Sequence, residues 1–406
     1  MKCVSPKCKK HKDKCVKPNP YVEALAKCKR DYISIQQCKD DYNKDTKLAK
    51  KLSCTRYKER FDEDLPYSVI DNKKVVKTPA AISKEKLIVN DRIKSYFNFM
   101  KQIKTTGKFQ VIKKNKYSYG DLQLLNKIGS ESKYGAAYMV KYKDFSLAAK
   151  IMCVNYSNDL EVKLLKRVTK YVLNKKTIHF PIIYFNKLIE KNDDIPNMLL
   201  PEAIQYCHNF HLIFSEIFSG DLNMFIRNVH SLDIIQNTIT QIFFSISNFS
   251  YYTNYVHLDA HGGNFLYHRV THSNYYHYKI NGKDLYLKNM GYMWVIWDYG
   301  FASKATYRRV FKDYRRVIKR FIPKVFGGWN TVSSQQPNYK MTDAELFAYN
   351  IKRDIDRMKY NFDSQLKDIN LLKFEIHKVL LSYLPKSYFV KPDEVILNEG
   401  NPFIIQ

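Results

Sequence analysis

Two short polar segments set among apolar residues constrain this chain more than any other feature. In the first, Tyr255–Leu266, Asp259 comes five residues before Asn264. The second, Asp298–Gly300, follows directly on the apolar run Met293–Trp297. The apolar residues beside both segments predict short buried strands. Each string is common by chance when it stands alone, so their combination in one chain gives them weight.

These residue types in this order suit phosphoryl transfer. In that reaction an enzyme mostly positions groups and neutralises charge, so it needs a carboxylate at the attacking hydroxyl and oxygen ligands for Mg²⁺. We interpret Asp259 as the catalytic base, and Asn264 and Asp298 as the metal ligands. The alternative is two unrelated polar turns in a core, which does not explain the partners upstream.

A lysine inside an apolar strand is the first of these partners. Phe145–Met152 predicts a strand that carries Lys150, and a buried ammonium without a partner is costly. Glu161 is the only Glu between Lys150 and Ile189, and it lies on a predicted helix. We therefore predict a Lys150–Glu161 ion pair that presents Lys150 to the α- and β-phosphates. The alternative is a lysine that reaches solvent from an edge strand.

A strand, a turn of small residues and a second strand precede this lysine. Leu122–Ile128 and Ala136–Tyr142 flank a turn that runs from Gly129 to Gly135, and a turn of this kind covers the nucleotide phosphates in kinases. This turn departs from G-x-G-x-x-G, because Glu131 occupies the second Gly position and the last Gly comes one residue late. A plain hairpin explains these residues equally well.

The segment Ser215–Leu222 is predicted to be the hinge between two lobes. There the backbone of Glu216 and Phe218 would contact the adenine of ATP. We predict an α+β chain of four parts, in which residues 1–77 are a basic, Cys-rich extension and residues 78–118 are a linker with an amphipathic helix. Residues 119–215 are a small β-rich lobe, and residues 216–406 are a large helical lobe.

The large lobe is predicted to be helical apart from one ribbon. Apolar residues at helical spacing in Ile234–Phe249 predict a helix that supports the first polar segment. An Asn-Gly turn in Tyr276–Leu287 predicts an inserted, surface-exposed hairpin. No A-P-E sequence follows Gly300, and Asp313 arrives early enough to indicate a short connecting segment. We expect Asp313 to accept backbone N–H groups of the catalytic loop, and residues 374–381 to form a closing helix.

Cysteines are concentrated in the N-terminal extension, since six of the eight lie within the first 54 residues. Four side chains near the start form a candidate structural Zn²⁺ site: Cys3, Cys8, His11 and Cys15. Their C-x4-C-x2-H-x3-C spacing matches no standard zinc knuckle. A disulfide between Cys28 and Cys38, or free thiols, are the alternatives, although disulfides are rare in the cytosol.

The charge balance favours anionic partners. The chain has 68 Lys and Arg against 39 Asp and Glu, a net charge of +29, so the basic extension is expected to dock acidic proteins or nucleic acid. The alternative is that the charge serves solubility alone. No apolar run approaches membrane-spanning length, and Met1–Ser5 lacks the apolar segment of a signal peptide. We therefore expect no membrane span and a cytoplasmic protein that is not secreted.

In this order, the A-x-K strand, the H-x-D-x-H-x-x-N loop and the D-Y-G sequence resemble the protein-kinase-like superfamily over about residues 122–381. The missing A-P-E and the composition are similar to divergent serine/threonine kinases of large cytoplasmic DNA viruses, of the poxvirus virion kinase type. The resemblance implies a bilobal fold, ATP with Mg²⁺ or Mn²⁺, protein substrates, and a place in a virion or in the host cytoplasm.

The resemblance also implies a role for each matching residue. It implies the phosphate-anchoring pair Lys150 and Glu161, the base Asp259, and the metal ligands Asn264 and Asp298. His257 would support the D-Y-G sequence. His261 stands where typical protein kinases have a Lys that contacts the γ-phosphate, and a His there is common in small-molecule kinases. Three functions are therefore open: a protein Ser/Thr kinase, which we favour, an aminoglycoside- or choline-type kinase, and a pseudokinase scaffold.

Overall fold

The computed structural model describes residues 10–11, 14–15, 89–103, 107–113, 116–129, 135–191, 195–270, 274–329, 339–362 and 368–406. The chain divides into two units, Met1–Lys73 and Lys74–Gln406. In the first unit the described residues form two paired strands, β1 (Lys10–His11) and β2 (Lys14–Cys15). The other candidate Zn²⁺ ligands, Cys3 and Cys8, lie outside the described residues, as do Cys28 and Cys38.

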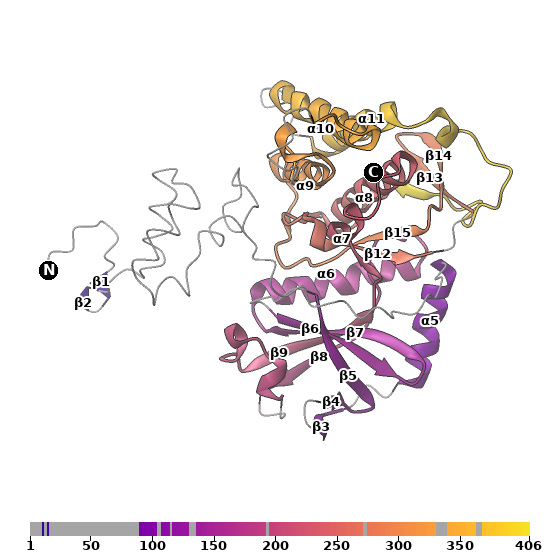
Figure 1. Cartoon of the computed structure of the whole chain (residues 1–406). Coiled ribbons are helices and arrows are strands. Elements are labelled where there is room, and N and C mark those ends of the chain that lie inside the picture. The colour runs from indigo at the N-terminus through magenta and orange to yellow at the C-terminus, as the bar shows by residue number, and fades with distance from the viewer. Residues whose placement is uncertain are drawn as a thin grey trace. The chain divides into compact units, whose positions relative to one another are not determined.

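The second unit has the predicted α+β, bilobal architecture (Figure 1), and its small lobe is built on an antiparallel seven-stranded sheet. The strand order is β3-β4-β5-β6-β7-β9-β8. The strands are β3 (Phe109–Lys113), β4 (Lys116–Tyr119), β5 (Leu122–Ile128), β6 (Gly135–Tyr142), β7 (Phe145–Cys153), β8 (Ile183–Glu190) and β9 (Asn209–Glu216). The sheet starts at Phe109, ahead of the predicted boundary at residue 119, because β3 and β4 extend it with buried aromatic residues.

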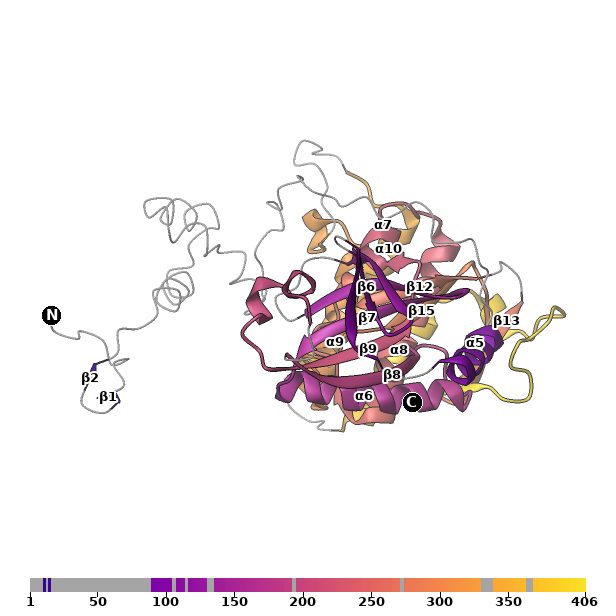
Figure 2. The same cartoon turned by 90° about the horizontal axis from the view of Figure 1, so that it is seen from below.

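Two helices accompany this sheet. α6 (Tyr156–Leu173) begins after Asn155, whose side chain accepts the N–H of Asn158 as an N-cap. α5 (Val89–Gln102) lies beside β8 (Figure 2). Its fully buried Phe99 is surrounded by the rings of Tyr142, Phe145, Tyr184 and Phe185. The predicted amphipathic helix therefore packs on the small lobe.

Helices dominate the large lobe, as predicted. They are α7 (Leu222–Ile226), α8 (Leu232–Thr253), α9 (Tyr307–Ile318), α10 (Asp343–Phe362) and α11 (Ile369–Tyr383). Six 3₁₀ turns complete the described helical elements of the chain: η1 (Asn197–Leu199), η2 (Glu202–Ile204), η3 (Gly262–Asn264), η4 (Lys319–Phe321), η5 (Lys324–Phe326) and η6 (Lys386–Phe389). Among the described residues, no helix combines the length and apolar character that crossing a membrane requires.

Short strands place the two polar segments next to each other. β10 (Gly220–Asp221), β12 (Phe265–Arg269) and β15 (Tyr292–Ile296) form one sheet in that order. β12 follows the first polar segment and β15 precedes the second, and the two strands pair antiparallel. β11 (Tyr255–Val256) pairs with β16 (Ser303–Lys304), which closes the other side of the loop. The buried helix α8 lies beneath this arrangement.

One face of the ribbon between Asn264 and Asp298 is buried in the core, so the prediction of a surface-exposed insert was wrong for that face. β13 (Tyr275–Ile280) and β14 (Lys283–Lys288) are joined by the predicted Asn281-Gly282 turn, with φ of 48° and 76°. β17 (Phe403–Ile405) pairs in parallel with β13. Alternate residues of the ribbon face the core: Tyr276, Tyr278, Ile280, Leu285 and Leu287. The ribbon is therefore part of the large-lobe core.

A disulfide joins Cys153 to Cys207 in the small lobe. Cys153 ends β7 and Cys207 stands two residues before β9, so the bond links the ends of two neighbouring strands. The sequence analysis assigned no partner to either cysteine.

Candidate active site

Lys150 lies between two carboxylates. β7 carries Lys150, and its Nζ is 2.7 Å from Oε1 of Glu161 on α6 and 3.2 Å from Oδ1 of Asp298. The predicted Lys150–Glu161 ion pair is therefore confirmed, and Asp298 is a second partner. Burial alone would lower the pKa of Lys150, but the two carboxylates outweigh this effect and raise it above its ordinary value. Lys150 consequently stays charged at neutral pH.

Asp259 is held by three side chains. Asn264 Nδ2 donates to the Asp259 carbonyl oxygen at 2.9 Å and to Oδ2 at 3.3 Å. His261 Nδ1 accepts the N–H of Gly263 at 3.0 Å, so in the neutral ring the hydrogen is on Nε2, which lies 3.4 Å from Asp259 Oδ2. Arg316 Nη2, from α9, lies 3.1 Å from Oδ1. Burial raises the pKa of Asp259, but His261 and Arg316 overcome this and lower it to about 2.

Two residues connect the loop to its surroundings. Asp313 accepts the backbone N–H groups of His257 at 2.7 Å and Leu258 at 2.9 Å, which confirms the prediction for Asp313. His257 Nδ1 accepts the N–H of Asp259 at 3.3 Å, and His257 Nε2 donates to the Trp297 carbonyl at 2.7 Å. His257 therefore joins the catalytic loop to the D-Y-G segment, as the resemblance implied.

Left-handed backbone at two positions shapes the site. Leu258 has φ of 59° and Asp298 has φ of 65°, a conformation that costs about 1–3 kcal/mol at a non-glycine residue. The Leu258 N–H donates to the Asp313 carboxylate, and Lys150 donates to the Asp298 carboxylate, so both residues are held in place. Strain of this kind is typical of residues whose side chains must point in one direction.

Asn264 and Asp298 can supply oxygen ligands to a divalent cation. The N–H of Trp297 donates to the Asn264 carbonyl at 2.8 Å, so the two residues lie on adjacent backbone segments. The NH₂ group of Asn264 is bonded to Asp259, which leaves its Oδ1 for a cation, while Asp298 keeps Oδ2 beside the oxygen that contacts Lys150. Hard oxygen donors suit Mg²⁺ and Mn²⁺, so these residues fit the implied metal.

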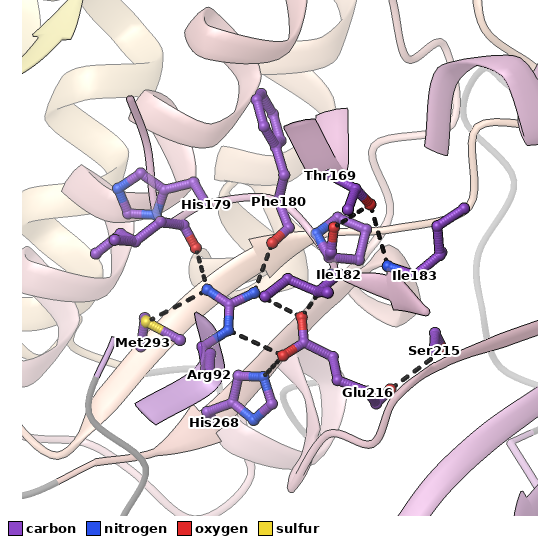
Figure 3. Close-up of polar contacts among 12 residues, drawn as sticks. Arg92, Thr169, His179, Phe180, Ile182, Ile183, Ser215, Glu216, His268 and Met293 are labelled. Atoms are coloured by element: carbon purple, nitrogen blue, oxygen red, sulfur yellow. Dashed lines mark hydrogen bonds and ion pairs between the residues drawn. The ribbon is translucent and has the colours of Figure 1, made fainter. Parts of the chain in front are cut away.

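The contact between the Glu216 backbone and an adenine stays a prediction, but the Glu216 side chain has structural partners that were not predicted. Its carboxylate is buried and accepts from Arg92 Nε at 2.9 Å and Arg92 Nη2 at 2.5 Å, and from the N–H of Ile182 at 2.8 Å. His268 Nε2 lies 3.0 Å from the same carboxylate (Figure 3). The Glu216 N–H donates to the Ile182 carbonyl at 3.1 Å. Only the carbonyl oxygen of Glu216, which accepts the Ser215 hydroxyl at 3.2 Å, is left to contact an adenine.

Arg92 connects four parts of the second unit. Besides the hinge carboxylate, its guanidinium donates to the carbonyls of Ile178 at 2.9 Å and Phe180 at 2.7 Å, in the loop after α6 (Figure 3). Met293 Sδ on β15 lies 3.9 Å from Nη1. Burial would raise the pKa of Glu216, but Arg92 and His268 lower it to about 2. The role of Arg92 was not predicted from the sequence, because Arg92 stands 124 residues before its partner Glu216.

Aromatic side chains lie between the hinge and Lys150. The Phe218 ring is 4.5 Å from the His268 ring and 6.2 Å from the Trp297 ring. The Trp297 ring is in turn 5.9 Å from Lys150 Nζ. Trp297 thus offers an aromatic face between Phe218 and Lys150. In the sequence, Trp297 is marked only as the end of an apolar run.

The two glycines of the predicted phosphate loop differ in their surroundings. Gly129 has φ of 76°, which favours glycine. Gly135 begins β6 and is buried, and a Cβ there would lie 2.4 Å from the Ile151 carbonyl oxygen. Strand packing therefore explains Gly135 without a nucleotide. Residues 130–134, with Glu131, lie outside the described residues.

Neither a protein-family model nor a curated protein matches the sequence. Among solved structures, the chain is similar to vaccinia related kinase 3, at 11% identity and a TM-score of 0.37. The match covers 74% of this chain and 91% of that chain. The strand order of the small lobe, the helical large lobe and the placement of the paired Lys and Glu between them make this a bilobal, protein-kinase-like fold.

Proposed function

We propose that this chain is an ATP- and Mg²⁺-dependent protein kinase that transfers the γ-phosphate to Ser or Thr hydroxyls of protein substrates. The observation that carries the proposal is the position of Lys150, which contacts both Glu161 at 2.7 Å and Asp298 at 3.2 Å. A lysine in this position can bind nucleotide phosphates while the two carboxylates fix its direction. The bond between Asp259 and Asn264 supports the proposal that the acceptor side of the same site lies on the adjoining loop.

The residues divide the reaction among them. Lys150 holds the α- and β-phosphates, and Trp297 with Phe218 packs against the purine. Asn264 and Asp298 would hold Mg²⁺, which would supply charge neutralisation at the transferring phosphate. Asp259, ionised because its pKa is about 2, accepts the hydrogen bond of the substrate hydroxyl and orients that oxygen for attack. Mn²⁺ fits the same ligands.

His261 has a distinct part in this scheme. Its Nε2–H faces Asp259, at the position where the resemblance places a lysine that contacts the γ-phosphate. We propose that His261 donates to the γ-phosphate once the substrate hydroxyl occupies Asp259. The resemblance to kinases of large DNA viruses supports a role in a virion or in the host cytoplasm. The basic extension is proposed to dock acidic proteins or nucleic acid.

One observation favours a small-molecule kinase as a second candidate. The connection between the D-Y-G segment and α9 consists only of residues 301–306. A connection this short leaves little chain to bind a polypeptide substrate in the usual way. His261 agrees with this alternative. The contacts of Lys150 with Glu161 and Asp298 argue against a pseudokinase scaffold, because an active kinase needs these three side chains together.

Transfer of labelled phosphate tests these functions. We would incubate the protein with labelled ATP, Mg²⁺, casein, a basic protein and small alcohols, and then analyse the phosphoamino acids. The matched variants are Asp298→Ala and, as a control, Asp144→Ala, which removes an exposed carboxylate from the β6–β7 turn. We expect label on Ser or Thr, lost in the first variant and kept in the second.

The other outcomes contradict the proposal in different ways. Label found only on small alcohols would identify a small-molecule kinase. Stabilisation of the protein by ATP in a thermal melt, with no transfer to any acceptor, would identify a scaffold.

A further inference from the structure

The segment after the D-Y-G sequence is strongly basic. Between Ser303 and Lys324 there are nine Lys and Arg residues and one acidic residue, Asp313. The cations are Lys304, Arg308, Arg309, Lys312, Arg315, Arg316, Lys319, Arg320 and Lys324. Asp313 is buried and bonded to the catalytic loop, so it does not balance the charge at the surface. The excess of positive charge per residue in this segment is well above that of the whole chain.

The arrangement along α9 separates the cations from the core. The apolar residues of the helix are buried: Val310, Phe311, Tyr314, Val317 and Ile318. Four cations at the start of the segment are exposed and define what we call the basic α9 surface: Lys304, Arg308, Arg309 and Lys312. The helix therefore presents one apolar face to the lobe and a cationic face to solvent.

Protein carboxylates neutralise the inner end of this segment but not the basic α9 surface. Arg315 pairs with Asp356 at 2.5 Å, and Arg316 pairs with Asp259. Arg309 donates to the Ser303 hydroxyl at 2.6 Å and to the Lys304 carbonyl at 3.3 Å, both uncharged groups. Within the described part of the chain, none of the four surface cations forms an ion pair. The repulsion among these four cations does not stabilise the fold, and a cluster of this kind indicates an external anionic partner.

The basic α9 surface flanks the proposed acceptor position. β16 places Lys304 opposite Tyr255, two residues before the catalytic loop segment that begins at His257. Farther along the helix, Arg316 contacts Asp259 at 3.1 Å. At about 1.5 Å per residue, Arg308 and Lys312 lie about 12 Å and about 6 Å from Arg316 along the axis. An extended peptide rises about 3.3 Å per residue, so these separations correspond to about two to four residues.

We propose that the basic α9 surface recognises an acidic segment of the protein substrate, with anionic side chains about two to four residues from the acceptor hydroxyl. The inference rests on the proposed function, since it places the acceptor at Asp259. The anions are carboxylates or phosphorylated side chains, which share the charge that Arg and Lys bind. A polypeptide is favoured over nucleic acid because the surface is one short helix beside the acceptor, where the chain that carries the hydroxyl must lie.

Matched peptides and matched variants of the full chain test this assignment. The peptides have one Ser flanked at two to four residues by Asp, phosphoserine, Ala or Lys. The test variant is Arg308→Ala/Lys312→Ala, and the control is Lys283→Ala/Lys386→Ala, which removes the same charge from exposed positions elsewhere. We expect KM to be about tenfold lower for the Asp or phosphoserine peptide than for the Ala peptide. The test variant should lose this preference with unchanged KM for ATP, and the control should keep it.

Charge reversal provides a second test. Arg308→Glu/Lys312→Glu should shift the preference toward the Lys peptide, which a loss of folding would not do. Equal KM values for the Asp and Ala peptides in the unmodified chain would overturn the proposal, and so would an equal loss of preference in the test and control variants. Whichever of Asp and phosphoserine gives the lower KM identifies the source of the anion.

Binding without catalysis separates this inference from the proposed function. Fluorescence anisotropy of the labelled Asp peptide, without ATP, should show binding that the test variant weakens and the control does not. Such binding without any phosphate transfer would support the surface and contradict the kinase assignment. A labelled single-stranded oligonucleotide that binds more tightly, through the same two residues, would replace the peptide as the partner and overturn the proposal.

Discussion

At the scale of single residues, the site depends on the contacts among three buried or half-buried charged side chains, Lys150, Glu161 and Asp298. Lys150 serves two carboxylates, one on α6 and one in the D-Y-G segment. The Lys150 side chain is 17% exposed, whereas the Glu161 side chain is 1% exposed. A change at Lys150 therefore leaves Glu161 without a countercharge in a place that water hardly reaches.

Lys150→Met should abolish phosphate transfer and destabilise the protein by no more than about 3–5 kcal/mol. Burial already raises the pKa of Glu161 to about 7, so without Lys150 this carboxyl group takes up a proton instead of remaining an unpaired charge. Transfer from labelled ATP and chemical unfolding would measure the two effects. Lys163→Met, at an exposed position on α6, is the matched control and should change neither. Transfer that survives in Lys150→Met would remove this lysine from the mechanism.

The buried carboxylate of Glu216 should make the stability of the protein depend on pH. Its pKa of about 2 in the folded protein lies below the ordinary value of 4.5, so its contribution is present above pH 4.5 and is lost as the pH falls toward 2. The shift corresponds to about 3 kcal/mol. Unfolding followed from pH 6 to pH 2 should lose this amount in the unmodified chain but not in Glu216→Gln. The exposed Glu202→Gln should follow the unmodified chain, and identical curves for Glu216→Gln would show that the carboxylate is not held as described.

At the scale of elements, α5 belongs to the kinase fold although it precedes the sheet. Arg92 bonds the loop after α6 and the hinge strand β9, and through Glu216 it reaches His268 on β12 of the large lobe. The loop after α6 follows the helix that carries Glu161. The guanidinium therefore fixes strand β9 and the loop after α6 relative to each other.

Arg92→Met should cost about 3–5 kcal/mol of unfolding free energy, since it strands the Glu216 carboxylate. The double variant Arg92→Met/Glu216→Gln should recover part of this loss, because no buried charge is then unpaired. Urea unfolding of the two single variants and the double variant measures the effect, with Lys94→Met, at an exposed position on α5, as the control. A double variant as unstable as the sum of the two single variants would show that the two residues act independently.

The disulfide is the second element-scale constraint. Cys153 and Cys207 are separated by 54 residues, and closing a loop of this length stabilises a protein by about 4 kcal/mol in the chain-entropy view. Cys153→Ala/Cys207→Ala should therefore unfold at lower urea than the oxidised protein and similarly to the reduced one. If oxidised and reduced protein unfold together, the bond contributes nothing to stability.

At the scale of the whole molecule, local patterns predicted more than long-range contacts did. The strand that carries Lys150, the helix that carries Glu161 and the Asn281-Gly282 turn each follow from a few neighbouring residues. The contacts of Arg92, Arg316 and β17 do not, because each partner lies far away in the sequence and no periodicity marks it. The ribbon was misjudged because Tyr was read as a surface residue, whereas alternate Tyr side chains fill the core.

The buried position of Arg92 also decides where an independently folding fragment must begin. The strand pattern alone places the start of the small lobe at residue 119, and the sheet itself starts at Phe109. A fragment that begins at either point lacks α5. It would expose the apolar neighbours of Phe99 and leave the buried Glu216 carboxylate without Arg92. We expect 74–406 to give a cooperative unfolding transition by circular dichroism and 119–406 to give none. A buried ion pair thus sets the N-terminal limit of this protein-kinase-like fold, and boundaries for expression or truncation should be chosen upstream of Val89.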